Sequence, residues 1–207
     1  MTPTVPSKIV CVGRNYVAHA RELGNEVPTQ PLLFLKPPSS LLKGGAPIVL
    51  PDDSSRVEHE GEIGVVIATR ARHLSESEAL TAVAGFVALN DVTARDLQRL
   101  DVQFTRGKSF DTFCPVSTDM APADTDWTRL EVVCRVNGTV RQHGHAGNMV
   151  FGIPHLIAYI SRIMTLEPGD LIATGTPEGV GPLEPGDVVE VELLGHARVT
   201  NPVIRER

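Results

Sequence analysis

Three glutamates stand on alternate positions in the stretch 57–67, which ends in an apolar, β-branched run. Side chains two positions apart share one face of a strand, so Glu58, Glu60 and Glu62 are expected to point the same way. Like charges on one face repel each other, and a divalent cation with oxygen ligands would relieve that repulsion. An exposed strand edge whose carboxylates face water is the alternative. The pattern alone leaves both interpretations open.

A fourth carboxylate, Asp91, follows another apolar run that is expected to be a strand. Functional groups are commonly presented just past strand ends. Two glutamates and this aspartate would make an all-oxygen site, which suits Mg²⁺ or Mn²⁺ better than zinc. For Asp91 alone, a turn or a helix N-cap is the alternative role.

Two further groups could transfer protons or bind an anion. His19 and Glu22 are three residues apart in an expected helix, so they share a face, and a carboxylate beside an imidazole makes the ring a better base. An ordinary surface ion pair is the alternative. Lys108 lies in the loop sequence Arg-Gly-Lys-Ser-Phe, where it could hold an anionic substrate group or simply be solvated.

The stretch Thr174-Gly175-Thr176-Pro177 follows an apolar strand, so its backbone donors and hydroxyls could bind a carboxylate; a plain turn fits equally well. His143 and His145 follow an expected hairpin, where they could form a metal-binding tract or be flexible surface histidines. His59 points to the face opposite Glu58 and Glu60 and is expected to be buried and hydrogen-bonded.

Most of the elements that must position these residues are short. Sixteen prolines and 18 glycines divide the chain into short segments, which favours a β-rich fold. Asn137-Gly138 predicts a type I′ hairpin turn, Ser75 and Glu78 fit a capping box, and Thr93 is expected to cap a helical turn. Strands are expected at 8–12, 32–35, 48–50, 85–89, 130–136, 139–141, 171–173, 188–194 and 197–200, helices at 14–24, 75–84 and 154–164, and a loop at 103–119. We predict a mainly β fold with short helices, of the α+β class.

Composition excludes several classes of function. The 207 residues are 42% hydrophobic and 21% charged, as expected for a globular chain, and we predict one domain over 1–207 with 1–50 as an N-terminal elaboration. The net charge of −6 and the lack of a basic cluster argue against nucleic-acid or membrane partners. The chain has no signal-peptide pattern and no apolar run of 18 residues, so we expect a cytoplasmic protein. Three widely spaced cysteines indicate neither a disulfide framework nor a zinc site.

Taken together, several short motifs resemble the fumarylacetoacetate hydrolase superfamily, in its small single-domain, acylpyruvase-like branch. The resemblance runs in family order from about residue 9 to the C-terminus and implies a mixed β-sandwich roll, usually assembled as a homodimer. The motifs are Val12-Gly13-Arg14-Asn15-Tyr16 with His19 and Glu22, Phe34-Leu35-Lys36-Pro37, His59 to Gly64, Asn90 to Asp96, Gly107 to Phe110, Val136-Asn137-Gly138 and Leu171 to Gly181.

The resemblance also implies roles for individual residues. It places Mg²⁺ or Mn²⁺ on Glu60, Glu62 and Asp91, which leaves Glu58 out of the ligand set. It makes His19 and Glu22 the water-activating pair on a short lid helix. The remaining roles are charge stabilisation by Lys108, a substrate carboxylate contact by Thr176, and positions near the pocket for Arg14, Arg95 and Gln98. Gly61, where a bulkier residue would be unremarkable, faces away from the metal and is expected to affect only local packing.

The activity implied by the resemblance is hydrolysis of a carbon–carbon bond in a 2,4-diketo acid, such as acetylpyruvate or fumarylpyruvate, to pyruvate and a carboxylic acid. The same metal-stabilised enolate would also support oxaloacetate decarboxylation, keto–enol tautomerisation or isomerisation of a 2-hydroxy-dienoate. A non-catalytic metal-binding β protein is the alternative of another class.

Overall fold

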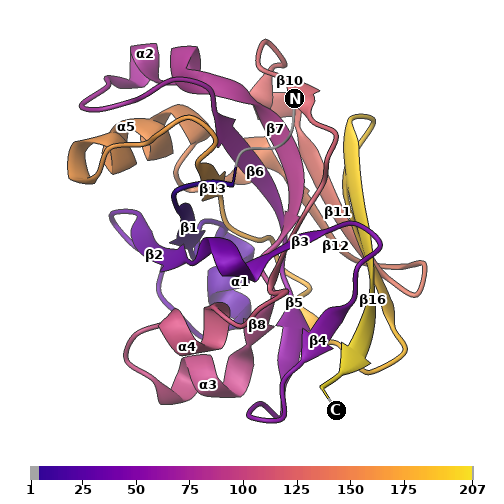
Figure 1. Ribbon diagram of the computed structural model, residues 1–207. Helices are drawn as coiled ribbons and strands as arrows, with labels where there is room; N and C mark the ends of the chain where they lie inside the picture. The colour runs from indigo at the N-terminus through magenta and orange to yellow at the C-terminus, as the bar shows by residue number, and fades with distance from the viewer. Residues whose placement is uncertain (1–4, 207) are drawn as a thin grey trace.

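The computed structural model describes residues 5–206 as mostly β structure with a few short helices. A large mixed sheet and a five-stranded sheet pack face to face, and a three-stranded sheet completes the fold (Figure 1). β6 (Gly61–Ile67) contacts β11 (Glu131–Val136), and β7 (Val83–Asn90) contacts β15 (Val188–Leu193) and β16 (Ala197–Arg205). The main core therefore lies between these two sheets. The predicted fold class and the curled β-sandwich are confirmed.

The large sheet carries the strands that lead into the site. β1 pairs in parallel with β13, which in turn pairs antiparallel with β6. Its strands, in spatial order, are β2 (Leu32–Lys36), β1 (Ile9–Gly13), β13 (Leu171–Ala173), β6 (Gly61–Ile67), β7 (Val83–Asn90), β9 (Cys114–Val116) and β3 (Leu41–Lys43), with β10 (Ala121–Pro122) also on β7. β6 is buried along almost its whole length, because both its faces are covered.

The other two sheets are antiparallel apart from one parallel pair. The five-stranded sheet consists of β12 (Thr139–His145), β11 (Glu131–Val136), β15 (Val188–Leu193), β16 (Ala197–Arg205) and β4 (Ile48–Leu50), where β16 and β4 run in parallel. Asn137 and Gly138 both have positive φ angles, 52° and 77°, which fits the predicted type I′ turn between β11 and β12. The small sheet consists of β14 (Gly181–Pro182), β5 (Val57–His59) and β8 (Thr93–Ala94).

The helices cover the ends and outer faces of the large sheet (Figure 1). α2 and α5 pack against each other, and α4 packs against β2. The α-helices are α1 (Val17–Glu22), α2 (Glu76–Ala79), α3 (Arg95–Leu100), α4 (Thr105–Lys108) and α5 (Ile153–Ile163), and the 3₁₀ helices are η1 (Pro38–Ser40), η2 (Leu80–Ala82), η3 (Trp127–Arg129) and η4 (Ala146–Asn148). The capping box of Ser75 and Glu78 is present. No helix among the described residues is long and apolar enough to cross a membrane.

Two local predictions were wrong. The segment 103–119 is not a loop throughout, because it contains α4 and β9. Thr93 is not the cap of the following helix: it lies in β8, and Ala94 is the N-cap of α3. The Thr93 hydroxyl instead donates to the carbonyl of Asp91, 2.8 Å away. β8 and β9 form because they pair with neighbouring strands, and α4 packs against α3, β8 and β2. Local composition does not show these tertiary contacts.

Candidate active site

Three carboxylates predicted to act together do meet in the structure. One oxygen from each of Glu60, Glu62 and Asp91 lies within 4.8 Å of the others, and all three side chains are buried. Glu58 is also buried, so the interpretation of this stretch as a solvated edge was wrong. The Glu58 carboxylate pairs with Arg56 and Arg95 and is not part of the group of three.

A break in the strand allows this meeting. β5 ends at His59 and β6 begins at Gly61, so Glu60 lies between two strands of different sheets. The Glu60 amide donates to the side chain of Asn90 (2.9 Å), and the Asp91 amide donates to the carbonyl of Glu60 (2.8 Å). These two bonds hold Asp91 beside Glu60, although the two residues are far apart in the sequence.

Two buried lysines compensate part of the negative charge. The Lys108 ammonium lies 2.7 Å from a carboxylate oxygen of Glu60 and 2.7 Å from one of Asp91. The Lys36 ammonium lies 2.6 Å from the other oxygen of Asp91. Burial lowers the pKa of Lys108, but the charges of Asp91 and Glu60 outweigh it and raise that pKa, so the ammonium stays protonated. Sequence reasoning gave Lys36 no role, although it lies in one of the motifs.

Glu62 lacks such compensation. Among residues 5–206 no lysine, arginine or histidine forms an ion pair with Glu62, and its hydrogen bond comes from the Gly175 amide at 2.8 Å. Burial raises the pKa of Glu62, and the charges of Asp91 and Glu60 raise it further. For Glu60, by contrast, Lys108 and Arg95 outweigh burial and lower the pKa. A cluster of buried carboxylates with one member that forms no ion pair among the described residues fits a hard divalent cation such as Mg²⁺ or Mn²⁺.

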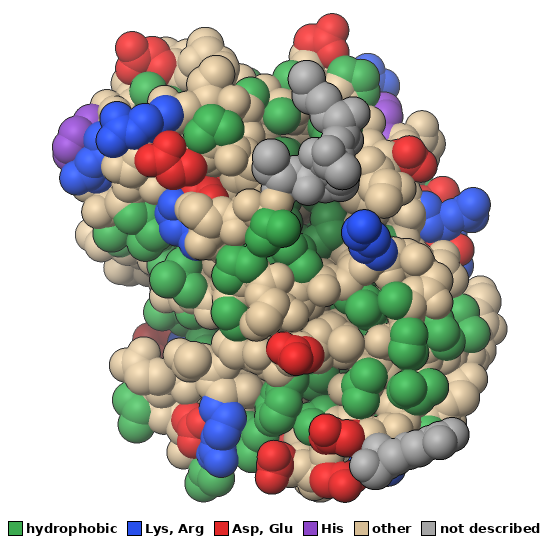
Figure 2. Space-filling view, viewed as in Figure 1, with side chains coloured by type: hydrophobic (Ala, Val, Ile, Leu, Met, Phe, Trp, Pro, Cys, Tyr) green, Lys and Arg blue, Asp and Glu red, His purple; other side chains and the backbone are tan. Residues whose placement is uncertain are grey.

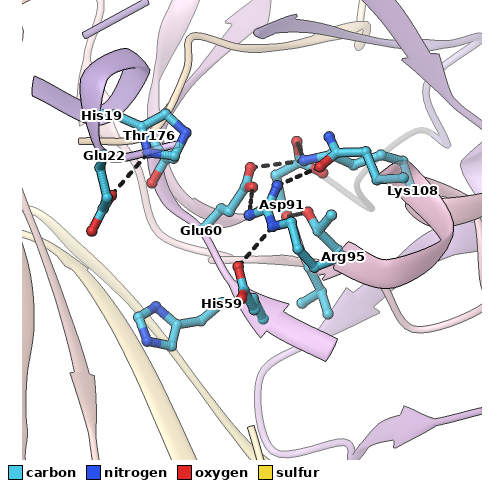
Figure 3. A network of polar contacts seen from close by, with 12 residues as sticks. His19, Glu22, His59, Glu60, Asp91, Arg95, Lys108 and Thr176 are labelled. Atoms are coloured by element: carbon cyan, nitrogen blue, oxygen red, sulfur yellow. Dashed lines mark hydrogen bonds and ion pairs between the residues drawn. The ribbon is translucent and has the colours of Figure 1, made fainter. Parts of the chain in front are cut away.

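Arg95 lines the cavity but is largely occupied by carboxylates. Its guanidinium pairs with both Glu58 and Glu60 and donates to the Gln98 side chain. It therefore joins β5 to the carboxylate group as a buried counter-ion. Figure 3 shows Arg95 and Lys108 reaching Glu60 from one side, while His19 lies on the other. Gln98 is at the cavity wall as expected, and so is Arg99, which sequence reasoning missed.

His19 and Glu22 on α1 contact each other, as predicted. The Nδ1 atom of His19 lies 3.3 Å from a carboxylate oxygen of Glu22, and His19 is buried and lines the cavity. Glu22 also accepts hydrogen bonds from the Gly179 amide at 3.0 and 3.2 Å. Asn15 anchors the start of this helix, because its side chain bonds both Phe151 and the carbonyl of Thr174. Glu22 therefore connects α1 to the loop after β13.

The loop Thr174 to Pro177 continues the pairing of β13 along β6 through its side chains. The hydroxyl of Thr174 donates to the carbonyl of Ile63 (2.7 Å), and that of Thr176 donates to the carbonyl of Gly61 (2.9 Å). Both hydroxyl protons are therefore used inside the protein. Two backbone donors of this loop are also used inside the protein, since the Thr174 amide donates to the carbonyl of Ile63 (3.2 Å) and the Gly175 amide donates to Glu62 (2.8 Å). Thr176 lines the cavity.

Gln142 holds this loop and the ligand strand together. Its amide nitrogen donates to the Thr176 hydroxyl (2.7 Å) and to the carbonyl of Pro177 (2.8 Å). Its amide oxygen accepts from Gly61 N (2.9 Å) and lies 3.1 Å from Nδ1 of His59. His59 is thus buried and hydrogen-bonded as predicted, and it points away from the carboxylates (Figure 3). Nothing in the sequence indicated this role for Gln142, because it is a single glutamine in a predicted hairpin with polar neighbours.

These side chains surround one cavity of about 300 Å³. Its wall combines the three carboxylates with positive groups and a few apolar side chains. Arg14 also lines the cavity. Its backbone φ is positive, 59°, which is uncommon for a residue other than glycine. The residues at the wall are Val12, Gly13, Arg14, His19, Leu23, Asn25, Phe34, Glu60, Glu62, Asp91, Arg95, Gln98, Arg99, Phe104, Lys108 and Thr176. All the sequence-predicted site residues except Glu22, which reaches the cavity through His19, are among them.

Comparison with known proteins identifies the family of this chain. The model of the family described as fumarylacetoacetate (FAA) hydrolase C-terminal matches residues 8–204. The chain belongs to the fumarylacetoacetate hydrolase family. The sequence resemblance is thereby confirmed for nearly the whole chain.

Named relatives are also similar over most of their length. A protein of Arabidopsis thaliana named oxaloacetate tautomerase FAHD1, mitochondrial, is 45% identical over 96% of this chain and 92% of its own. One of Dictyostelium discoideum named oxaloacetate decarboxylase, mitochondrial, is 48% identical over 91% of this chain and 89% of its own. The crystal structure of a 5-carboxymethyl-2-hydroxymuconate delta-isomerase from Mycobacterium smegmatis is 42% identical, with a TM-score of 0.91 over 98% of this chain and 80% of that one.

Proposed function

We propose that this protein is a metal-dependent keto–enol tautomerase of oxaloacetate or of a 2-oxo dicarboxylic acid of similar size. The observation that carries the proposal is the contact of Lys108 with both Glu60 and Asp91 at the cavity wall. It sets a permanent positive charge where an enolate oxygen would need one. A cavity of about 300 Å³, at the small end for ligand sites, and the names of the relatives also support it.

The site residues have two kinds of proposed role, charge stabilisation and proton transfer. Mg²⁺ or Mn²⁺, when bound by Glu60, Glu62 and Asp91, would act as a Lewis acid toward the negative charge that develops on the 2-oxo oxygen. Lys108 adds a second positive charge from a buried position, where electrostatic interactions are strong. The backbone N–H of Thr176 and the side chain of Arg14 are the donors proposed to hold the substrate carboxylates.

His19 is the proposed proton carrier. Glu22 holds Nδ1 of the ring, which leaves Nε2 for the substrate. Nε2 takes a proton from the carbon beside the 2-oxo group, the electron pair of that C–H bond forms the C=C bond of the enolate, and the π pair of the C=O bond moves onto the oxygen. Return of the proton to the oxygen gives the enol, and return to the carbon restores the ketone. No water is consumed, so the balance is that of an isomerisation.

Hydrolysis of acylpyruvates is the second candidate, and the His19–Glu22 pair favours it. The same Nε2 could take a proton from water, which would then attack the distal carbonyl and release a pyruvate enolate. Decarboxylation of oxaloacetate requires the same enolate stabilisation without the attacking water.

The cytoplasmic location stays a proposal, and two relatives are named mitochondrial.

Three reactions measured in parallel test these proposals. The enol of oxaloacetate is followed by its ultraviolet absorbance, and pyruvate release is followed from oxaloacetate and from acetylpyruvate, each with Mg²⁺ and with chelator. We expect Mg²⁺-dependent tautomerisation to be the fastest reaction. Faster cleavage of acetylpyruvate would make the hydrolase correct instead, and faster pyruvate release from oxaloacetate would make the decarboxylase correct.

The variants Lys108→Met and His19→Gln separate catalysis from metal binding. We expect each to lower turnover by about 10²–10⁴-fold, the range for one positioned proton-transfer or charge-stabilising group. Bound Mg²⁺ without any of the three reactions would contradict the tautomerase and leave the 2-hydroxy-dienoate isomerase or the non-catalytic metal-binding protein.

A further inference from the structure

A second group of potential metal ligands lies on the outer face of the β11–β12 hairpin. Glu131 begins β11, and His143 and His145 are near the end of β12. In the strand register Glu131 lies directly opposite His145, and His143 is two residues away on the same face. All three side chains are solvent-accessible, with exposed fractions of 33%, 48% and 51%.

The donor atoms converge. Nε2 of His143 lies 2.7 Å from Oε2 of Glu131, and Nδ1 of His145 lies 3.7 Å from the same oxygen. The two imidazole rings are 5.1 Å apart, with 30° between their planes. In tetrahedral zinc sites, bonds of about 2.0–2.1 Å place neighbouring donors about 3.4 Å apart. The observed separations straddle that value, and small rotations of exposed side chains would match it.

We propose that Glu131, His143 and His145 form a second metal site, one for Zn²⁺ or a similar transition-metal ion. Two imidazole nitrogens and one carboxylate oxygen are ligands that such ions favour, whereas Mg²⁺ prefers oxygen alone. The two candidate sites found among residues 5–206 therefore differ in chemistry as well as in place. The solvent side leaves a fourth coordination position for water.

The site is separate from the cavity but adjoins its supporting strand. None of its three residues lines the cavity. On the opposite face of β12, Gln142 holds the loop after β13, and Gly144 packs so closely on Pro177 that a Cβ there would lie 2.7 Å from the ring. A metal ion bound to Glu131 and both histidines would link β11 to β12 beside these contacts. It would therefore stabilise the hairpin that carries Gln142.

A pair elsewhere on the surface provides a matched control. His155 on α5 lies 2.8 Å from Glu76 on α2, so it has the same histidine–glutamate contact as His143 and Glu131. Its ring neighbours are Phe151 and Tyr159, which are not zinc ligands of this class. If a single histidine–carboxylate pair were enough for zinc, both surface positions would bind it.

The experiment is titration of the intact protein with Zn²⁺ in saturating Mg²⁺, with bound zinc measured after equilibrium dialysis. Zinc that enters the carboxylate cluster is common to all variants and cancels in the comparison. We expect wild type and His155→Ala to bind one equivalent more than the double variant His143→Ala/His145→Ala. Zn²⁺ should also raise the Tm of wild type more than that of the double variant.

Single variants refine the result. Glu131→Gln and His143→Ala should each weaken the extra equivalent by at least about tenfold, since even outer-shell partners of metal ligands are worth about 10–100-fold. Circular dichroism confirms that the variants are folded. Equal zinc stoichiometry and equal affinity in wild type and double variant would overturn the proposal, as would loss of the extra equivalent in His155→Ala.

Discussion

Glu62 carries the least compensated charge of the carboxylate cluster. Lys36, Lys108 and Arg95 all contact Asp91 or Glu60, and none of them pairs with Glu62. The raised pKa of Glu62 has the same origin, since burial comes together with two neighbouring carboxylates. This residue therefore gives the sharpest test of the proposed metal site.

The change Glu62→Gln is expected to separate folding from metal binding. Removal of the charge relieves repulsion, so the chelator-treated variant should be at least as stable as chelator-treated wild type. Mg²⁺ should raise the Tm of wild type and have almost no effect on the variant. Turnover should fall by at least about tenfold, because loss of a metal ligand costs no less than loss of an outer-shell partner. Thermal denaturation with Mg²⁺ and with chelator measures the first two effects.

Glu58→Gln is the matched control. Glu58 is equally buried but pairs with Arg56 and Arg95, so this variant should be less stable and still respond to Mg²⁺. If Glu62→Gln keeps the wild-type response to Mg²⁺, then Glu62 is not a ligand.

At the scale of elements, α3 is held in place by Asp96. This carboxylate accepts hydrogen bonds from the Ser54 hydroxyl (2.6 Å) and from the amide and hydroxyl of Ser55 (2.8 Å each). Burial raises the pKa of Asp96, but these bonds and one from the Leu97 amide outweigh it and lower the pKa to about 2. Asp96 thus joins the loop before β5 to the helix that carries Arg95, Gln98 and Arg99.

The lowered pKa predicts a pH-dependent contribution of Asp96 to stability. A group whose pKa is lower in the folded state stabilises the fold above its ordinary value of 3.8 and loses that effect as pH falls toward about 2. Asp96→Asn should therefore lower the free energy of unfolding by about 1–2 kcal/mol at pH 7 and by less at pH 3. Urea denaturation at several pH values measures this. Asp53→Asn, an exposed position in the same loop, should change stability by less than about 0.5 kcal/mol at either pH.

Gly61 packs directly against strands β11, β12 and β15 of the five-stranded sheet. A Cβ at this position would lie 2.9 Å from Cβ of Cys134 and 3.4 Å from the amide oxygen of Gln142. The sequence predicted that a larger residue at position 61 would affect only local packing. In the structure the affected contacts include the hydrogen bond from Gly61 N to the Gln142 side chain.

Gly61→Ala is accordingly expected to lower the free energy of unfolding by about 1–3 kcal/mol, the usual cost of overpacking. Gly44→Ala, where a Cβ would meet nothing closer than 3.7 Å, should change it by less than about 0.5 kcal/mol. Chemical denaturation of both variants gives the comparison. Equal effects of the two substitutions would show that the sheets separate easily at Gly61.

At the scale of the whole molecule, the homodimer stays a prediction. Figure 2 shows hydrophobic side chains gathered over the middle of one face. β2 is an edge strand of the large sheet, and its Leu35 is 47% exposed. Edge strands with exposed apolar residues are commonly covered by a partner.

Light scattering coupled to size-exclusion chromatography should therefore give twice the mass of one chain at micromolar concentration. Dilution should leave the mass unchanged if the dimer is stable. A mass of one chain across the same range would contradict the expectation that the resemblance supports.

The amino-acid sequence was enough to predict the family, the fold class and many of the elements that position the site. Short-range rules suffice for these: alternation predicts strands, Asn137-Gly138 requires positive φ angles, and the spacing of His19 and Glu22 places them on one helical face. The motifs in family order extended this to the family and to the three carboxylates. These features depend on residues that are close in the chain.

Only the tertiary structure decided which charges meet. Glu58 and Glu60 differ by two positions, yet the strand break at Glu60 puts Glu58 against Arg56 and Arg95 and Glu60 into the carboxylate cluster. Lys36 and Gln142 reach the site from distant strands, and no local pattern reports contacts across 55 and 81 residues. Electrostatic and hydrogen-bond partners depend on distance in space, which the order of residues does not contain.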